Sequence, residues 1–183
     1  DGSFELHIGL VPGGQVSGPA VRSLKRGDQV RIGAPVGDSL KLPQDTSRDL
    51  LMIAGGTGLA PFRAMLEHLD RSALPHQVPR VHLYHGARMP WNLYEHRQLT
   101  NLTQRPWFTY TPVVSDDTSY PGHRGQVSAV AAAQGAWQGR TVLVCGSPAM
   151  VRHTVADLTE AGVPATDIQT ESLGITTSAG SHQ

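Results

Sequence analysis

Residues 50–61 read LLMIAGGTGLAP, and this stretch decides the fold. Its first five residues form a continuous apolar run, which is typical of a parallel strand covered on both faces. The glycine-rich turn that follows opens a helix whose apolar residues Leu59, Phe62 and Leu66 share one stripe. A buried strand that leads through a tight turn into a helix indicates a parallel α/β sheet.

The rest of the chain repeats this alternation of strand and helix. Such alternation forms right-handed βαβ units, so the sequence predicts an α/β fold with one doubly wound, five-stranded parallel sheet. We assign this domain to residues 47–175 and expect the small, polar residues 176–183 to be a flexible tail. The strands are expected at 50–54, 81–85, 108–114, 141–145 and 168–173, and the helices at 59–69, 91–102, from about 126, and from 151 to 162.

Residues 1–46 show a different pattern. Apolar and polar residues alternate from Phe4 to Leu10 and again over 30–34, which predicts half-buried strands, with a last short strand at 40–42. Ser17 is positioned to cap a short helix between them. Three strands cannot close a barrel or bury a core alone, so we interpret this segment as the end of a larger β domain.

The composition excludes several classes of protein. The 183 residues carry no formal net charge, which argues against a nucleic-acid partner. No apolar run approaches the roughly 20 residues that a membrane helix needs, and no signal segment is recognised, so a cytoplasmic protein is expected. Cys145 is the single cysteine, which excludes an internal disulfide.

Two turns carry the clearest chemical signals. In the turn at 55–61, glycines let the backbone approach a diphosphate closely, and free amide groups of the following helix face the anion. Pro61 lies early in that helix, where its missing amide hydrogen costs nothing. The pattern G-x-G-x-x-G is not matched, because Pro61 stands in the place of its last glycine. A tight turn without a ligand is therefore the alternative interpretation.

The second turn, at 145–150, reads CGSPAM and follows the strand at 141–145. Ligands of open parallel sheets bind at the carboxyl ends of the strands, where the strand order reverses. We expect the two turns to flank that point and to form a crevice between them. Ser147 and Pro148 also fit a helix cap, which is compatible with a ligand because both use the same exposed amides.

Together with GQVS at 14–17 and GAPVG at 33–37, these two turns resemble the ferredoxin–NADP reductase superfamily. The resemblance covers about residues 4–174 and is greatest to flavohaemoglobin reductase modules and bacterial oxygenase reductases. It implies an FAD-dependent NAD(P)H oxidoreductase. Residues 1–46 would be the C-terminal remnant of an FAD-binding antiparallel β-barrel, and the domain after them would bind the nicotinamide dinucleotide.

The resemblance also implies roles for single residues. The turn at 14–17 would contact the flavin pyrophosphate, and the turn at 55–58 would hold the dinucleotide pyrophosphate with Thr57 near the nicotinamide. Cys145 would lie beside the nicotinamide ring, and Glu171 would face the flavin and tune its redox chemistry or relay a proton. The full set implied for cofactor binding is Gly14, Gln15, Val16, Ser17, Gly55, Gly56, Thr57, Gly58, Pro61, His85, Arg88, Ser115, Asp116, Gly146, Ser147, Pro148, Met150 and Leu173.

The main flavin signature of the family, Arg-x-Tyr-Ser or Arg-x-Tyr-Thr, is absent. Either the chain is a fragment of a longer reductase, with the signature upstream of Asp1, or it holds flavin weakly or not at all. We favour the fragment. The alternative is a module that binds a dinucleotide and catalyses nothing.

The choice between NADH and NADPH depends on the loop after 108–114, where the family reads the adenosine ribose. Asp116 and Asp117 would repel the 2′-phosphate of NADPH and accept bonds from free ribose hydroxyls, which favours NADH. A solvated acidic loop is the alternative. Arg88 argues weakly for NADPH, although it could equally pair with the pyrophosphate.

Other chemistries have weaker support. Cys145 at a helix amino terminus could be a nucleophile, but no feature of the sequence selects a partner histidine. His82 and His85 lie three residues apart on a strand, so their rings point to opposite faces, and no metal site is predicted. The favoured function is hydride transfer from NADH to FAD, followed by release of single electrons to a haem or iron–sulfur acceptor, such as an upstream globin.

Overall fold

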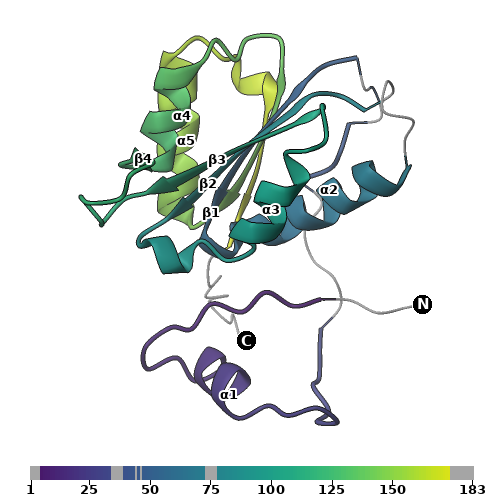
Figure 1. Ribbon diagram of the computed structural model, residues 1–183, viewed down its shortest axis with the longest axis vertical. Helices are drawn as coiled ribbons and strands as arrows, with labels where there is room; N and C mark the ends of the chain where they lie inside the picture. The colour runs from purple at the N-terminus through teal and green to yellow at the C-terminus, as the bar shows by residue number, and fades with distance from the viewer. Residues whose placement is uncertain (1–4, 34–38, 44, 46, 73–77, 174–183) are drawn as a thin grey trace, which may run out of the picture.

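The structure is a computed structural model that describes residues 5–33, 39–43, 45, 47–72 and 78–173. Its centre is one six-stranded sheet with the strand order β4-β3-β2-β1-β5-β6, in which all neighbouring strands run parallel. Helices cover both faces of the sheet (Figure 1). The strands are β1 (Leu50–Gly55), β2 (Val81–Ala87), β3 (Phe108–Val114), β4 (His123–Arg124), β5 (Thr141–Gly146) and β6 (Ile168–Ser172).

The helices fall between the strands as the alternation predicts. One difference concerns the helix expected at 91–102. It is divided into η3 and α3, because Glu95 adopts a left-handed backbone conformation with φ 60°. The α-helices are α1 (Ser17–Arg22), α2 (Leu59–Ser72), α3 (His96–Leu102), α4 (Val127–Gln134) and α5 (Pro148–Glu160), and the short 3-10 helices are η1 (Gly56–Gly58), η3 (Pro90–Asn92) and η4 (Ala165–Asp167).

The α/β fold is confirmed, but the prediction of five strands is wrong by one. The additional strand, β4, is two residues long and pairs in parallel with the end of β3 at Val113 and Val114. Two exposed residues show neither an apolar run nor an alternation, so no periodic pattern predicts this edge strand.

Two hydrophobic cores lie on opposite faces of the sheet, because successive side chains of a strand point to opposite sides. Met52 and Ala54 of β1 pack on the face covered by α2 and α3, with Phe62 of α2 among their neighbours. Leu51 and Ile53 pack on the other face, which α4 and α5 cover. The first five residues of β1 are all buried. Because both faces of the strand are covered, its apolar run is continuous.

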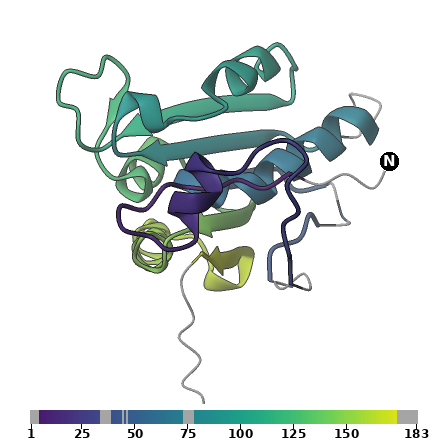
Figure 2. The same cartoon turned by 90° about the horizontal axis from the view of Figure 1, so that it is seen from below.

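The N-terminal segment differs from the prediction. Its described residues contain α1 but none of the strands expected at 4–10, 30–34 and 40–42. A strand exists only where a second strand pairs with it, and no described residue pairs with this segment. It crosses the carboxyl-end edge of the sheet as an irregular chain (Figures 1 and 2). Leu40 and Leu42 are partly buried and pack against the hydrophobic core that contains Met52 and Phe62.

Several details of the N-terminal segment also bear on the predictions. The helix α1 forms where it was expected, but Ser17 does not cap it; the Ser17 hydroxyl accepts a hydrogen bond from the Val11 amide at 3.1 Å. Residues 1–4, 34–38 and 176–183, and with them most of the GAPVG turn and the whole predicted tail, lie outside the described residues. Each helix in the described chain is too short or too polar to cross a membrane.

Candidate functional site

The strand order reverses between β1 and β5, and both glycine turns lie at that point. From β1 the chain adds β2, β3 and β4 on one side and then returns to place β5 and β6 on the other. Ala54 of β1 pairs with Cys145 of β5, so the turns that follow these two strands begin side by side. The two turns therefore meet at the switch point, but the pocket is lined by the first turn and, from the second, by Met150 alone, so it does not run between them.

The two turns touch each other closely. A Cβ atom on Gly58 would lie 2.2 Å from the carbonyl oxygen of Cys145, and one on Gly146 would lie 3.4 Å from the Cα atom of Gly55. No side chain fits at Gly58, because the obstacle is backbone. This glycine therefore lets the start of the helix pack against β5, whereas Gly56 has a different role.

Gly56 lines an open surface. Its φ is +53°, a backbone conformation that favours glycine, and a Cβ atom there would meet nothing within 4 Å. Met150 of α5 lies across the neighbouring turns, since a Cβ on Gly55 would be 3.3 Å from its Cγ and one on Gly146 would be 2.8 Å from its Sδ. A ligand could thus reach the backbone at Gly56 while Met150 covers the junction of the turns.

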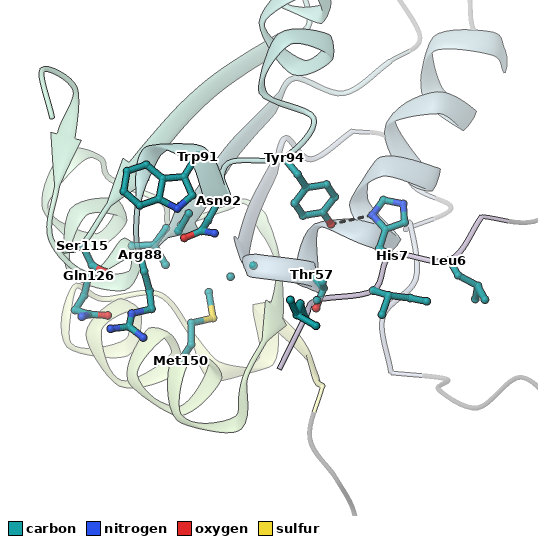
Figure 3. Close-up of a pocket in the computed structure, with 18 of the residues that line it drawn as sticks. Leu6, His7, Thr57, Arg88, Trp91, Asn92, Tyr94, Ser115, Gln126 and Met150 are labelled. Carbon is teal, nitrogen blue, oxygen red and sulfur yellow. Dashed lines mark hydrogen bonds between the residues drawn. The ribbon is translucent and has the colours of Figure 1, made fainter. Parts of the chain in front are cut away.

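A pocket of about 790 Å³ extends from the turn along the carboxyl ends of β1, β2 and β3 (Figure 3). This volume lies within the range typical of small-molecule and cofactor sites, roughly 300–1,000 Å³. The residues that line it are Glu5, Leu6, His7, Ile8, Gly9, Leu10, Gly55, Gly56, Thr57, Gly86, Ala87, Arg88, Trp91, Asn92, Tyr94, Ser115, Gln126, Val127 and Met150.

One end of the pocket is closed by residues 5–10. The His7 Nδ1 atom and the Tyr94 hydroxyl share a hydrogen bond of 2.8 Å, and the two rings meet edge to face (Figure 3). His7 Nε2 also lies 3.0 Å from a carboxylate oxygen of Glu5. A Cβ on Gly9 would be 3.4 Å from the Thr57 methyl group, so the segment lies against the glycine turn. The sequence did not indicate the bond between His7 and Tyr94, because these residues lie 87 positions apart.

The other end of the pocket holds a hydrogen-bonded group of three predicted residues. Arg88 Nε donates to Asp116 Oδ2 at 2.7 Å, and Ser115 Oγ donates to Asp116 Oδ1 at 2.5 Å. These bonds, the one from Ser115 first, hold the pKa of Asp116 below its usual value, so the carboxylate is ionised. In the sequence, Asp116 favoured NADH and Arg88 favoured NADPH. In the structure, the two side chains form one ion pair.

Asp117 binds within its own loop and not at the pocket. Its carboxylate accepts hydrogen bonds from the Ser119 hydroxyl at 2.6 Å and from the Ser119 amide at 2.8 Å. The bonds from Ser119 keep the pKa of Asp117 below its usual value. Asp117 therefore stabilises its own loop, and Asp116 is the acidic residue beside the pocket.

Cys145 lies beneath the turns rather than in the open pocket. It is fully buried, and burial, with a smaller contribution from the charge of Glu171, raises the pKa of its thiol to about 12. Glu171 of β6 pairs in register with Cys145. A nucleophilic cysteine needs an accessible thiolate, so the geometry gives no support to nucleophilic catalysis by Cys145.

His85 is also buried. Burial lowers the pKa of its ring to about 4, although the nearby backbone of Gly56 opposes this shift. Its ring meets Tyr94 edge to face at 5.7 Å. His85 therefore supports the floor of the site and is not a pocket-lining residue. His82 points to the other face, where it bonds Thr111 at 2.9 Å and stacks on Tyr84.

The remaining predicted residues divide into two sets. Ser147 caps α5 as predicted, its hydroxyl accepting from the Met150 amide at 3.3 Å, and Pro148 is the first residue of that helix. Of the residues proposed to bind cofactor, Gly55, Gly56, Thr57, Arg88, Ser115 and Met150 line the pocket. Those that do not line it are Gly14, Gln15, Val16, Ser17, Gly58, Pro61, His85, Asp116, Gly146, Ser147, Pro148 and Leu173.

No metal site is recognised in the described part of the chain, where no group of three or more His, Cys, Asp or Glu side chains comes together. The site instead consists of backbone turns, an ion pair and a pocket that runs between them. A glycine turn that joins a buried strand to a helix, at the switch point of a parallel sheet, defines the class of dinucleotide-binding domains.

Comparison with known proteins agrees with that class. Residues 52–156 match the model of the oxidoreductase NAD-binding domain, and the chain belongs to this family, within the ferredoxin–NADP reductase superfamily. The resemblance that the sequence motifs indicated is therefore confirmed.

Individual relatives come from reductases of oxygenase systems. The chain is 34% identical over 161 residues to DmpP, the reductase component of phenol 2-monooxygenase from Pseudomonas sp. (strain CF600), which covers 84% of this chain and 44% of that protein. The crystal structure of the Amycolatopsis cytochrome P450 reductase GcoB superposes with a TM-score of 0.75 at 30% identity, covering 88% of this chain and 49% of that one.

A third comparison concerns the fold alone. The flavohaem-like FAD/NAD-binding domain of nitric oxide dioxygenase from Vibrio cholerae superposes with a TM-score of 0.73 at 20% identity, over 88% of this chain and 65% of that one. The chain spans about half the length of the curated relatives that it matches.

Proposed function

We propose that this chain is the nicotinamide-binding part of a reductase that takes hydride from NADH, passes it to FAD, and then delivers single electrons to an acceptor. The observation that carries the proposal is the contact between the two glycine turns at the switch point, with an open pocket leading away from Gly56. When bound, the two cofactors supply the redox chemistry, and the protein supplies binding, orientation and exclusion of water.

The residues present fit a dinucleotide. The open backbone at Gly56 and the amino end of the helix that follows offer amide groups to a pyrophosphate, and no side chain blocks their approach. Thr57 and Met150 lie beside this position. From here the pocket reaches Ser115 and Arg88, where the adenosine ribose would lie.

The Asp116–Arg88 pair supports NADH over NADPH. A 2′-phosphate would need a free cation, and the guanidinium of Arg88 already has a carboxylate partner at 2.7 Å. The phosphate would also meet the negative charge of Asp116. Free ribose hydroxyls, in contrast, can donate to that carboxylate. The pair is exposed, with 84% of the Arg88 side chain accessible, so salt screens this preference.

We also propose that residues 1–46 belong to a flavin-binding β-barrel, residues 47–175 form the NADH-binding domain, and residues 176–183 are a tail. Support comes from exposure: nine of the eleven exposed large hydrophobic residues in the described chain lie between residues 6 and 32. Strands of a larger domain would cover them. The roles of the turn at 14–17, of Cys145 near the nicotinamide and of Glu171 near the flavin belong to the same proposal.

For the acceptor we propose a haem or iron–sulfur centre. The relatives include the reductase component of a phenol monooxygenase and a cytochrome P450 reductase. A fused globin is one form that such an acceptor could take. A cytoplasmic location stays a prediction.

The alternative is a module that binds the dinucleotide without flavin, and the missing Arg-x-Tyr-Ser signature favours it for the chain as it stands. The two functions separate in one experiment on this chain and on a polypeptide extended upstream. The proposal expects the extended protein to be yellow and to reduce ferricyanide with NADH, and more slowly with NADPH. A colourless extended protein that binds NADH but reduces nothing would establish the alternative.

A substitution tests the site directly. Gly56→Val places a branched side chain where the backbone faces the pocket, so we expect NADH affinity to fall at least tenfold, about 1.4 kcal/mol, in a calorimetric titration. Gly56→Ala is the matched control, since it shares the positive φ but adds only a methyl group, and a smaller loss is expected. Unchanged NADH affinity in the valine variant would contradict the proposed site.

A further inference from the structure

The tryptophan at the outer end of the pocket is left in solvent. Trp91 is 75% exposed and has no ring contact with another described residue. The other two tryptophans, Trp107 and Trp137, are buried, and each packs against a neighbouring aromatic ring. An exposed indole that lines a pocket presents a free aromatic face on which a ligand inside the pocket can stack.

The backbone holds this indole in a fixed place. Trp91 is the middle residue of η3, where the Asn92 amide donates to the Met89 carbonyl at 2.9 Å and the Leu93 amide to the Pro90 carbonyl at 3.1 Å. Leu93 is buried and anchors the end of the turn. The ring is thus presented on a short, hydrogen-bonded turn, which lowers the entropy lost when a ligand stacks on it.

The position of Trp91 fits one part of a dinucleotide. It lines the same pocket as Gly56, but at the far end, near Arg88 and Ser115 (Figure 3). If the pyrophosphate lies at the glycine turn and the adenosine ribose at Asp116, the group attached to that ribose falls at this end. That group is the adenine base.

We infer that Trp91 is the stacking surface for the adenine base of the bound dinucleotide. The inference rests on the proposed function and extends it by naming the residue that binds the base. Every base has a π face, and stacking on an aromatic ring is a recurrent means of holding it. The nicotinamide half lies at the other end of the pocket, so Trp91 contributes to affinity and not to hydride transfer.

The test compares two halves of the ligand on this chain. We expect Trp91→Ala to weaken binding of ADP-ribose, which contains the adenine, about tenfold. Binding of reduced nicotinamide mononucleotide, which lacks it, should not change. Trp91→Phe keeps an aromatic face and should restore most of the affinity. ADP-ribose should also quench the tryptophan fluorescence of the wild type, and this quenching should be lost in Trp91→Phe.

The controls keep the outcomes distinct. Arg97→Ala changes an exposed residue of α3 outside the pocket and should leave both affinities unchanged. Equal ADP-ribose affinity in the wild type and Trp91→Ala overturns the role of Trp91 while the proposed function stands. An equal loss for both ligand halves also overturns it, because a stacking surface for adenine acts on one half alone. A wild type that binds neither ligand overturns the proposed function itself.

Discussion

The sheet region and the N-terminal segment of this chain differ in where their strands find partners. Every buried hydrophobic residue in the described chain lies between Leu50 and Val163, whereas no residue between 5 and 33 is fully buried. Both regions carry clear strand patterns in the sequence. The βαβ units of the sheet region supply partners for one another, whereas the strands predicted in the N-terminal segment find no partner among the described residues.

The largest expected difference between the two regions is in core packing. Leu143→Ala removes a fully buried side chain from β5 and should lower the free energy of unfolding by about 2–5 kcal/mol. Leu10→Ala, its counterpart in the exposed segment, should change it by less than about 0.5 kcal/mol. Urea denaturation measures both, and similar losses in the two variants would end the distinction between the regions.

A second difference lies in the glycines. Gly58→Ala forces a methyl group against the backbone of Cys145 and should lower the free energy of unfolding by about 1–3 kcal/mol. Gly18→Ala in α1 has nothing within 4 Å of the new methyl group and should be neutral or slightly stabilising. If Gly58→Ala is as stable as the wild type, the close contact between the turns is not as the structure describes it.

A third effect concerns the response of the folded sheet region to acid. Burial lowers the folded-state pKa of His85 to about 4 from an unfolded value near 6.5, so below pH 6.5 the unfolded chain binds the proton first. The contribution to stability is complete above pH 6.5 and is lost as the pH falls toward 4. Between neutral pH and pH 5 the loss should be on the order of 2 kcal/mol.

Urea denaturation at several pH values checks this prediction. His85→Gln cannot take up the proton, so its stability should fall less over the same pH interval than that of the wild type. His153→Gln replaces an exposed histidine of α5 and should leave the pH dependence as it is. A pH dependence that His85→Gln does not reduce would show that other groups cause it.

Much of the sheet could be predicted because each strand carries its own signal. The predicted and observed bounds of β1, β2, β3, β5 and β6 differ by two residues at most. β4 could not be predicted, since an exposed two-residue strand has no period. The break before α3 depends on the left-handed backbone of Glu95, a conformation that a non-glycine residue seldom adopts. No pattern in the sequence predicts it.

The site was predictable where it is made of backbone and unpredictable where it is made of distant side chains. The two glycine turns were recognised from their own residues, and the sheet topology then brought them together. His7, Tyr94 and Trp91 were missed because their place at the pocket depends on tertiary contacts. The family resemblance implied a cofactor-binding role for His85, but its side chain is fully buried and does not line the pocket.

The ion pair between Asp116 and Arg88 has a practical consequence for protein engineering. A neutral residue at 116 would change two properties with one mutation, because it removes the anion and also releases the guanidinium that the anion holds. Reversing the charge at this end of the pocket would otherwise take two substitutions, one that removes a negative charge and one that adds a positive charge. Here the positive group is already in position, restrained by its neighbour.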